Sequence, residues 1–300
     1  MSVPATAAAA TRHRTVEVDG LEIFYREGGD PANPTVMLLH GFPTSSYMFR
    51  NLIPALADEF HLVAPDYPSF GWSSFPPREE FDYTFERFAE VVLDVADALG
   101  LSRFSIYMHD YGAPIGLRVA SRHPERVQAL IVQSGNAYTE GFTPLWEPLF
   151  AFAADRNRET EVPVRGLLTD EAVRWLWTHG TRDQGAIAPE SWMLDAGNLN
   201  RAGNREVQLD IFYDYRHNIP EYEAFQRYFR AHRPPTLVLW GTGDEVFGPG
   251  GAEAYRRDLP DAEVQLLDTG HFVLEEDLEL IAGTMRRFLR ANVSEAVPKA

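Results

Sequence analysis

Two aspartates and a histidine stand where short apolar runs of the chain end. Asp110 follows a run that ends at Met108, Asp244 follows the run TLVLW, and His271 lies in the segment TGHF near the C-terminus. A carboxylate that attacks carbon, a histidine that activates water and a second carboxylate that orients the histidine are sufficient for hydrolysis. Their chain order is that of nucleophile, acid and base in sites built on a strand-to-helix elbow. Each residue is individually common in turns, so the order of all three carries the prediction.

The sequence around Asp110 is typical of a nucleophile elbow. His109-Asp110-Tyr111-Gly112-Ala113 connects an apolar run to a helical pattern, with small residues after the polar one. Serine usually occupies the centre of this motif. A carboxylate there is favoured in its ionised form by the N-terminus of the helix and needs no base to activate it. The motif alone fits equally well an aspartate that caps the helix; Asp244 and His271 favour the nucleophile.

A second loop is predicted to face this elbow. His40-Gly41-Phe42-Pro43 follows the apolar run Thr35–Leu39, where such sites obtain one backbone donor. We expect the backbone N–H groups of Phe42 and Tyr111 to converge as an oxyanion hole. An ordinary turn is the alternative interpretation of this motif by itself.

Composition limits the function classes. Hydrophobic residues make up 45% of the 300 residues and charged residues 24%, which is typical of a globular protein. The net charge of -17 disfavours nucleic acid and anionic membrane surfaces as partners. Cysteine is absent, so disulfides and thiolate metal sites are excluded. No metal-ligand spacing, signal peptide or transmembrane run is recognised, so we expect a cytoplasmic monomer or homodimer with no cofactor or metal and with water as cosubstrate.

The elements that position these residues alternate between strand and helix. Apolar runs of strand length, typical of a parallel sheet covered on both faces, occur at Thr35–Leu39, His61–Ala64, Phe104–Met108, Val127–Val132, Thr236–Trp240 and Val264–Leu267. A hairpin is predicted at Thr15–Val18 and Leu21–Tyr25, and helices at Tyr47–Ala57, Phe85–Leu99, Ala113–Arg122 and Leu278–Leu289. The alternation stops after Gly135 and resumes near 233. We therefore expect an α/β core at 14–135 and 233–292, a helical cap at 136–232, and flexible tails at 1–13 and 293–300.

The chain resembles the α/β-hydrolase superfamily, in particular its epoxide hydrolase and haloalkane dehalogenase branch. The resemblance covers about residues 15–290 and is strongest in HGFPTSSYMFRNLIPALADEFHLVAPDYPSFGWSS, MHDYGAPIG, GTGDEVF and DTGHF. It implies a mostly parallel eight-stranded sheet with helices on both faces and a helical cap inserted after the sixth strand. It also implies that Asp110 forms an alkyl ester with substrate carbon, which water activated by His271 and Asp244 then hydrolyses.

The resemblance is closer to epoxide hydrolases. Dehalogenases commonly hold the halide with an Asn and a Trp at the positions of Phe42 and Tyr111, although the Tyr111 hydroxyl remains a donor. Epoxide hydrolases typically place two cap tyrosines above the nucleophile as proton donors, and the segment DYRHN makes Tyr215 the candidate for the second. Plain packing within the cap is the alternative role for Tyr215.

No tyrosine occupies the expected position of the first donor in Leu149–Asn157. Further residues predicted at the substrate pocket are His40, Pro43, Tyr138, Trp175 and Trp177, and other cap aromatics, including Trp146 and Phe212, pack the cap or line an apolar cavity. The leading hypothesis is hydrolysis of an apolar epoxide to a vicinal diol. Hydrolytic dehalogenation is the first alternative, and a descendant that binds or cyclises a ligand without hydrolysis is the second.

Overall fold

The computed structural model of the protein describes residues 10–293. Its strands form one eight-stranded sheet with the order β1-β2-β4-β3-β5-β6-β7-β8. β1 and β2 form the predicted hairpin, β2 runs antiparallel to β4, and every other neighbouring pair is parallel. The strands are β1 Arg12–Val18, β2 Leu21–Gly28, β3 Thr35–Leu39, β4 His61–Pro65, β5 Phe104–His109, β6 Val127–Gln133, β7 Thr236–Gly241 and β8 Glu263–Leu267.

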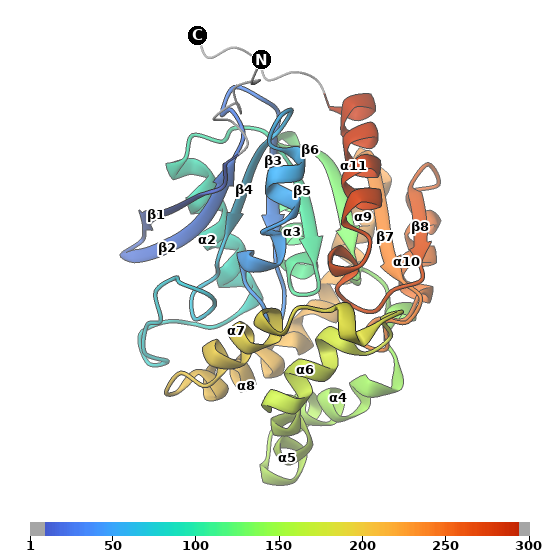
Figure 1. Ribbon diagram of the computed structural model, residues 1–300. Helices are drawn as coiled ribbons and strands as arrows, with labels where there is room; N and C mark the ends of the chain where they lie inside the picture. Colours follow the sequence, from blue (N-terminus) through green and yellow to red (C-terminus); the bar gives the residue numbers. More distant parts are fainter. Residues whose placement is uncertain (1–9, 294–300) are drawn as a thin grey trace.

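The central strands are apolar along their whole length because helices cover both faces of the sheet. Every residue of β3, β4, β5 and β7 is buried. α2, α3 and α9 pack together on one face, and α1 and α11 pack together on the other (Figure 1). The helices of these layers are α1 Leu52–Leu56, α2 Phe85–Ala98, α3 Gly112–Arg122, α9 Asn218–His232, α10 Gly250–Ala254 and α11 Leu278–Asn292.

In the N-terminal part of the chain, the structure differs from the sequence-based prediction at two elements. β1 begins at Arg12, so residues 12 and 13 belong to the sheet and not to the expected tail; most of both expected tails lies outside the described residues. The single helix expected at Tyr47–Ala57 is divided into a 3-10 turn at Ser46–Phe49 and the short α1. Pro54 explains the division, because it has no N–H to donate to a carbonyl one helical turn earlier.

The cap is inserted between β6 and β7, as the resemblance implies. Its helices are α4 Glu147–Ala154, α5 Arg158–Gly166, α6 Asp170–Thr178, α7 Pro189–Leu199 and α8 Asn204–Asp214, and they lie below the sheet in Figure 1. α9 falls inside the cap range of 136–232 but packs against α3 beside the sheet. The helical cap therefore ends near Asp214, because the apolar face of α9 is needed to cover the core.

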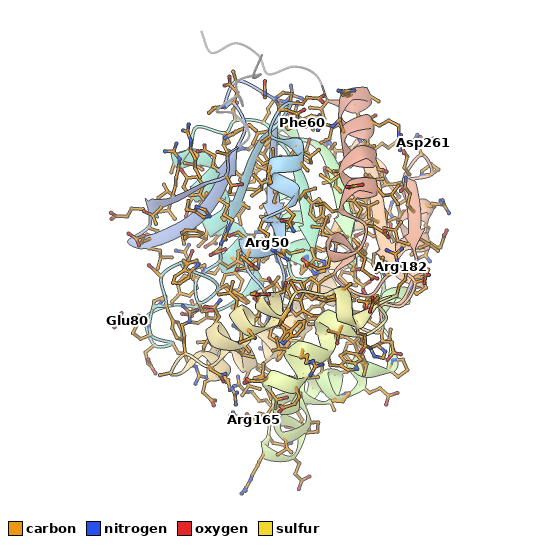
Figure 2. The ribbon with its side chains drawn as sticks, viewed as in Figure 1. Arg50, Phe60, Glu80, Arg165, Arg182 and Asp261 are labelled. Atoms are coloured by element: carbon orange, nitrogen blue, oxygen red, sulfur yellow. The ribbon has the colours of Figure 1, made fainter. Side chains whose placement is uncertain are left out.

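Two arginines labelled in Figure 2, Arg50 and Arg182, join the cap to the core. Arg50 binds both carboxylate oxygens of Glu275 at 3.0 and 2.8 Å, and it donates to Ser191 Oγ of α7 at 3.2 Å. Arg182, which follows α6, pairs with Asp277 at 2.7 Å. Glu275 and Asp277 follow His271 closely in the chain, so the cap is attached to the same segment that carries the candidate histidine.

One glycine allows the elbow helix to approach the sheet. A Cβ atom on Gly112, the first residue of α3, would lie 2.4 Å from the backbone oxygen of Leu39 in β3. Backbone cannot move aside as a flexible side chain can, so Gly112→Ala should lower the free energy of unfolding by about 1–3 kcal/mol. Urea denaturation measures this change.

Gly283 of α11 provides the matched control, because it is exposed and nothing lies within 4 Å of its added Cβ. Gly283→Ala should raise the free energy of unfolding by roughly 0.5–1 kcal/mol, because alanine favours the helix. Equal stability of Gly112→Ala and the wild type would contradict the close approach of α3 to β3.

Candidate active site

Asp110 occupies the turn between β5 and α3. Its φ of 51° lies in the left-handed region, where a non-glycine residue is uncommon and strained. The carboxylate accepts a hydrogen bond from the backbone N–H of Phe42 at 2.6 Å and another from the backbone N–H of Tyr111. The elbow and the loop after β3 therefore converge, and the two N–H groups hold the carboxylate itself.

Gly41 makes this approach possible. A Cβ atom at Gly41 would lie 2.3 Å from Asp110 Oδ1, closer than any side chain could tolerate. The Gly in the HGFP motif thus lets the loop place the Phe42 N–H against the carboxylate. The peptide bond between Phe42 and Pro43 is cis.

His271 is oriented by Asp244 through a buried ion pair. His271 Nδ1 lies 2.8 Å from Asp244 Oδ2, and both side chains are almost fully buried. The other oxygen of Asp244 accepts the backbone N–H groups of Val246 and Phe247 at 2.8 and 3.0 Å. Because Nδ1 donates to the carboxylate, Nε2 carries the lone pair when the ring is neutral. Nε2 is buried and has no hydrogen-bond partner among the described residues, so it can accept a proton from water.

The pKa values of Asp110 and His271 are set by burial and by the charged and hydrogen-bonding groups around each side chain. Burial raises the pKa of Asp110 to about 6, although the positive form of His271 and the two backbone N–H groups oppose the shift. Burial alone would lower the pKa of His271, but the charge and hydrogen bond of Asp244 and the charge of Asp110 outweigh it and raise that pKa above 6.5. Asp110 is therefore ionised above about pH 6, and neutral His271 forms above its own raised pKa.

A cavity of about 290 Å³ opens above Asp110 between the sheet and the cap. Apart from Asp110 and His271, its lining residues are apolar or aromatic. The lining residues are Phe42, Asp110, Tyr111, Leu145, Trp146, Leu149, Leu167, Ala172, Trp175, Leu176, Phe212, Val246 and His271. Such a cavity suits an apolar molecule with one reactive polar group directed at Asp110.

The structure brings several of the predicted pocket residues together at this cavity. Phe42, Tyr111 and Trp175 line it. His40 does not: it is buried beneath the loop, its Nε2 accepts the Tyr67 backbone N–H at 3.3 Å, and burial lowers its pKa to about 3. Pro43 is also outside the lining.

Two predicted pocket residues lie elsewhere. The Tyr138 hydroxyl donates to Asp258 at 2.8 Å, and the residue is buried against Tyr255 of the core. The Trp177 indole donates to Asp195 at 2.9 Å, and its ring stacks on Phe272 at 3.8 Å. Tyr138 thus supports the core, and Trp177 fixes the cap against the residue that follows His271.

Tyr215 lies beside the cavity but is not one of its lining residues. Its ring packs against Trp146 at 4.6 Å and Phe85 at 5.5 Å, and it lies 6.4 Å from the ring of Tyr111. Burial, together with the charges of Tyr222 and Asp110, raises the pKa of Tyr215 well above 10, so its hydroxyl stays protonated. A side-chain interaction between the hydroxyls of Tyr215 and Tyr222 also contributes to the raised pKa of Tyr215. The hydroxyl of Tyr111 is buried and has no hydrogen-bond partner among the described residues.

Sequence reasoning missed the aliphatic part of the lining. Leu145, Leu149, Leu167, Leu176 and Val246 were not identified as pocket residues, and neither was Ala172. The spacing of Ala172, Trp175 and Leu176 is i, i+3, i+4, so these residues share one face of α6. This apolar face of α6 is the sequence pattern from which these three residues could have been predicted. The pattern does not distinguish a helix face that packs on the sheet from one that lines a cavity.

A family model described as the alpha/beta hydrolase fold matches residues 34–278. The chain belongs to the α/β-hydrolase fold family. An uncharacterized hydrolase of Saccharomyces cerevisiae, YNR064C, is 41% identical over 275 residues, which cover 90% of this chain and 94% of the relative. Haloalkane dehalogenase 1 of Mycobacterium tuberculosis is 39% identical over 137 residues, 45% of each chain. The solved structure of the epoxide hydrolase CorEH covers 94% of this chain and 99% of its own with a TM-score of 0.77 at 18% identity, a likeness of fold.

The similarity of this α/β hydrolase to a haloalkane dehalogenase extends over less than half of the chain, and its similarity to an epoxide hydrolase structure is a likeness of fold. Within residues 10–293, no group of three His, Asp or Glu side chains could hold a metal ion. In the same range, no helix is long and apolar enough to span a membrane.

Burial of the Asp110 charge should weaken the fold of this α/β hydrolase. The folded-state pKa of about 6 exceeds the ordinary 3.8, so folding is opposed wherever the carboxylate is ionised in the unfolded chain. Asp110→Asn should therefore raise the free energy of unfolding at pH 8 by about 2–3 kcal/mol, from the roughly 1.4 kcal/mol that accompanies each pKa unit. The gain should disappear as the pH falls from about 6 to below 4, where Asp110 is protonated in both states.

Urea denaturation at pH 8 and at pH 4 measures the difference in the free energy of unfolding between Asp110→Asn and the wild type. Asp261→Asn, at an exposed position labelled in Figure 2, is the control and should leave the free energy of unfolding unchanged at both pH values. An Asp110→Asn variant less stable than the wild type at pH 8 would contradict the unfavourable burial.

Proposed function

We propose that the protein hydrolyses an apolar epoxide to a vicinal diol through a covalent ester on Asp110. The observation that carries the proposal is the buried carboxylate at the elbow, which lies at the floor of an apolar cavity together with a histidine whose Nε2 has no described partner. A carboxylate nucleophile displaces a leaving group at carbon and does not require a base in that step. The partners in this proposal are a small apolar substrate and water.

In the first half of the proposed reaction, one oxygen of Asp110 attacks an epoxide carbon. The new bond is the ester C–O bond, and the epoxide C–O bond breaks with its electron pair on the epoxide oxygen. That oxygen needs a proton, and Tyr215 is the proposed donor because its hydroxyl stays protonated beside the cavity. The Tyr111 hydroxyl is the nearest alternative, since Tyr111 lines the cavity and its hydroxyl has no described partner.

In the second half, His271 Nε2 removes a proton from water while the water oxygen attacks the ester carbonyl carbon. The carbonyl oxygen becomes negative and is held by the N–H groups of Phe42 and Tyr111, which contact the free carboxylate in the resting structure. Asp244 stabilises the imidazolium that forms. Collapse of the intermediate breaks the bond between the carboxyl carbon of Asp110 and the ester oxygen, which leaves with the substrate and takes the proton from His271 to complete the diol. The water oxygen stays in the Asp110 carboxyl group, and the proton that this group then loses restores the tyrosine donor.

The donors around the cavity favour an epoxide over a halide. Tyr111 replaces the Trp that a dehalogenase would place beside its nucleophile. The indole N–H of Trp146 is already donated to the Val246 carbonyl at 2.8 Å and is not available to a halide. Dehalogenation is the second candidate function, because 39% identity to Haloalkane dehalogenase 1 covers 137 residues and the Trp175 indole borders the cavity.

His271→Gln should trap the ester. With no base to activate water, incubation with a panel of terminal and aryl epoxides and alkyl halides should add the whole mass of an epoxide to the protein. Intact-mass measurement detects the adduct, and peptide mapping should locate it at Asp110. His232→Gln, at the exposed end of α9, is the control and should show turnover and no adduct.

The outcomes separate the candidates. An adduct that equals an alkyl group without its halogen would support dehalogenation. The absence of any adduct across the panel, from a folded variant, would contradict covalent catalysis by Asp110 with these substrates.

Tyr215→Phe should slow ester formation and leave ester hydrolysis unchanged. Loss of a general acid typically lowers the rate by about 10²–10⁴. Rapid-quench measurement of adduct formation in the His271→Gln background isolates this step. Tyr228→Phe, elsewhere on the described chain in α9, is the matched control. An unchanged rate of adduct formation would exclude Tyr215 as the donor and leave Tyr111 as the next to test.

A further inference from the structure

A buried amide connects the candidate histidine to two neighbouring strands. Gln133, the last residue of β6, is completely buried. Its Nε2 donates to the carbonyl oxygen of His271 at 3.1 Å and lies 3.0 Å from His109 Nδ1. Its Oε1 accepts a hydrogen bond from the Tyr107 hydroxyl of β5.

The orientation of this amide is fixed by its neighbours. A backbone carbonyl such as that of His271 can only accept, so the NH₂ group of Gln133 must face it. The Tyr107 hydroxyl then donates to the remaining oxygen. His109 and Gln133 are paired residues of adjacent parallel strands, so the amide lies across the end of the β5–β6 pair. Three contacts therefore hold this one side chain, two of them from β5 and one from the segment after β8.

The His271 backbone depends on this amide because its own segment is irregular. His271 lies between β8 and the 3-10 turn at Val273–Glu275, outside any regular ladder. The Asp244 contact fixes the ring at Nδ1 but leaves the position of the backbone to other contacts. Among the described residues, Gln133 donates the hydrogen bond that the His271 carbonyl accepts.

His109 completes the support without adding charge. Its ring lies 4.5 Å from the ring of His271, and burial together with the charge of His271 keeps its pKa well below 6.5. A second positive imidazole at this distance would oppose protonation of His271. A neutral His109 packs against the histidine that must accept the proton.

We infer that Gln133 is a positioning residue for His271, which aligns Nε2 for water activation through the backbone of the histidine. The inference rests on the proposed function, in which His271 acts only in ester hydrolysis. Loss of the Gln133 amide should therefore slow the second half of the reaction and leave the first half unchanged. A small displacement of a general base can lower the rate by about 100-fold.

Gln133→Met keeps the length of the side chain and removes its polar contacts with His271, His109 and Tyr107. With an epoxide that labels His271→Gln, single-turnover mass spectrometry should show adduct formation at the wild-type rate and hydrolysis slowed by about 10–100-fold. Tyr107→Phe removes the group that orients the amide and should give a smaller defect of the same kind. It also tests the inference if Gln133→Met does not fold.

Gln208→Met is the matched control. Gln208 is another buried glutamine, in α8 of the cap, and its amide contacts Asn204 rather than any candidate catalytic residue. The loss of a buried amide should lower stability in both variants, but only Gln133→Met should accumulate the ester. Histidine ¹⁵N NMR provides a readout without substrate: the His271 titration should shift in Gln133→Met and stay unchanged in Gln208→Met.

The failure of this inference can be distinguished from failure of the proposed function. If His271→Gln traps the ester while Gln133→Met and Tyr107→Phe hydrolyse it at the wild-type rate, the positioning role is wrong and the proposed function stands. If His271→Gln traps no ester, the proposed function is wrong. The NMR titration then decides the role of Gln133 alone: an unchanged His271 titration in Gln133→Met overturns it.

Discussion

The site depends on keeping a carboxylate out of water and still able to react. Asp110 is buried at the floor of an apolar cavity, and the backbone N–H groups of Phe42 and Tyr111 replace the hydration that it loses. Backbone donors carry no charge of their own, so they hold the carboxylate without the strong pairing that an arginine would impose. The left-handed turn at Asp110 and the glycine at 41 follow from the same requirement, because the two loops must approach within hydrogen-bonding distance.

The core and the order of the candidate triad could be predicted because both depend on local patterns. Fully buried parallel strands are continuous apolar runs, and the carboxyl ends of these strands meet at one edge of the sheet. Asp110 and Asp244 follow two such strands, and His271 lies in the loop after β8, which is an edge strand and only partly buried. Their residue types then indicate chemistry, since a carboxylate at an elbow has few other reasons to be held in a strained turn.

The cap and the supporting contacts could not be predicted in the same way. Aromatic residues of the cap are similar in sequence whether they face the cavity, as Trp175 does, or the core, as Trp177 does. Nothing in the sequence of residues 218–232 indicates that α9 packs against α3 and not within the cap. Gln133 was not singled out from the sequence, because its contacts with Tyr107 and His271 join residues that are far apart in the chain.

The apolar lining of the cavity has a consequence for product release in the proposed reaction. An epoxide has one weak acceptor oxygen, whereas a vicinal diol carries two hydroxyl groups that need hydrogen-bond partners. The walls formed by Leu145, Leu149, Leu167 and Leu176 offer none, so the diol would leave part of its polar surface unsatisfied while it stays bound. Water satisfies both hydroxyls outside. The same walls that retain the substrate would therefore expel the product, and turnover would be protected from product inhibition.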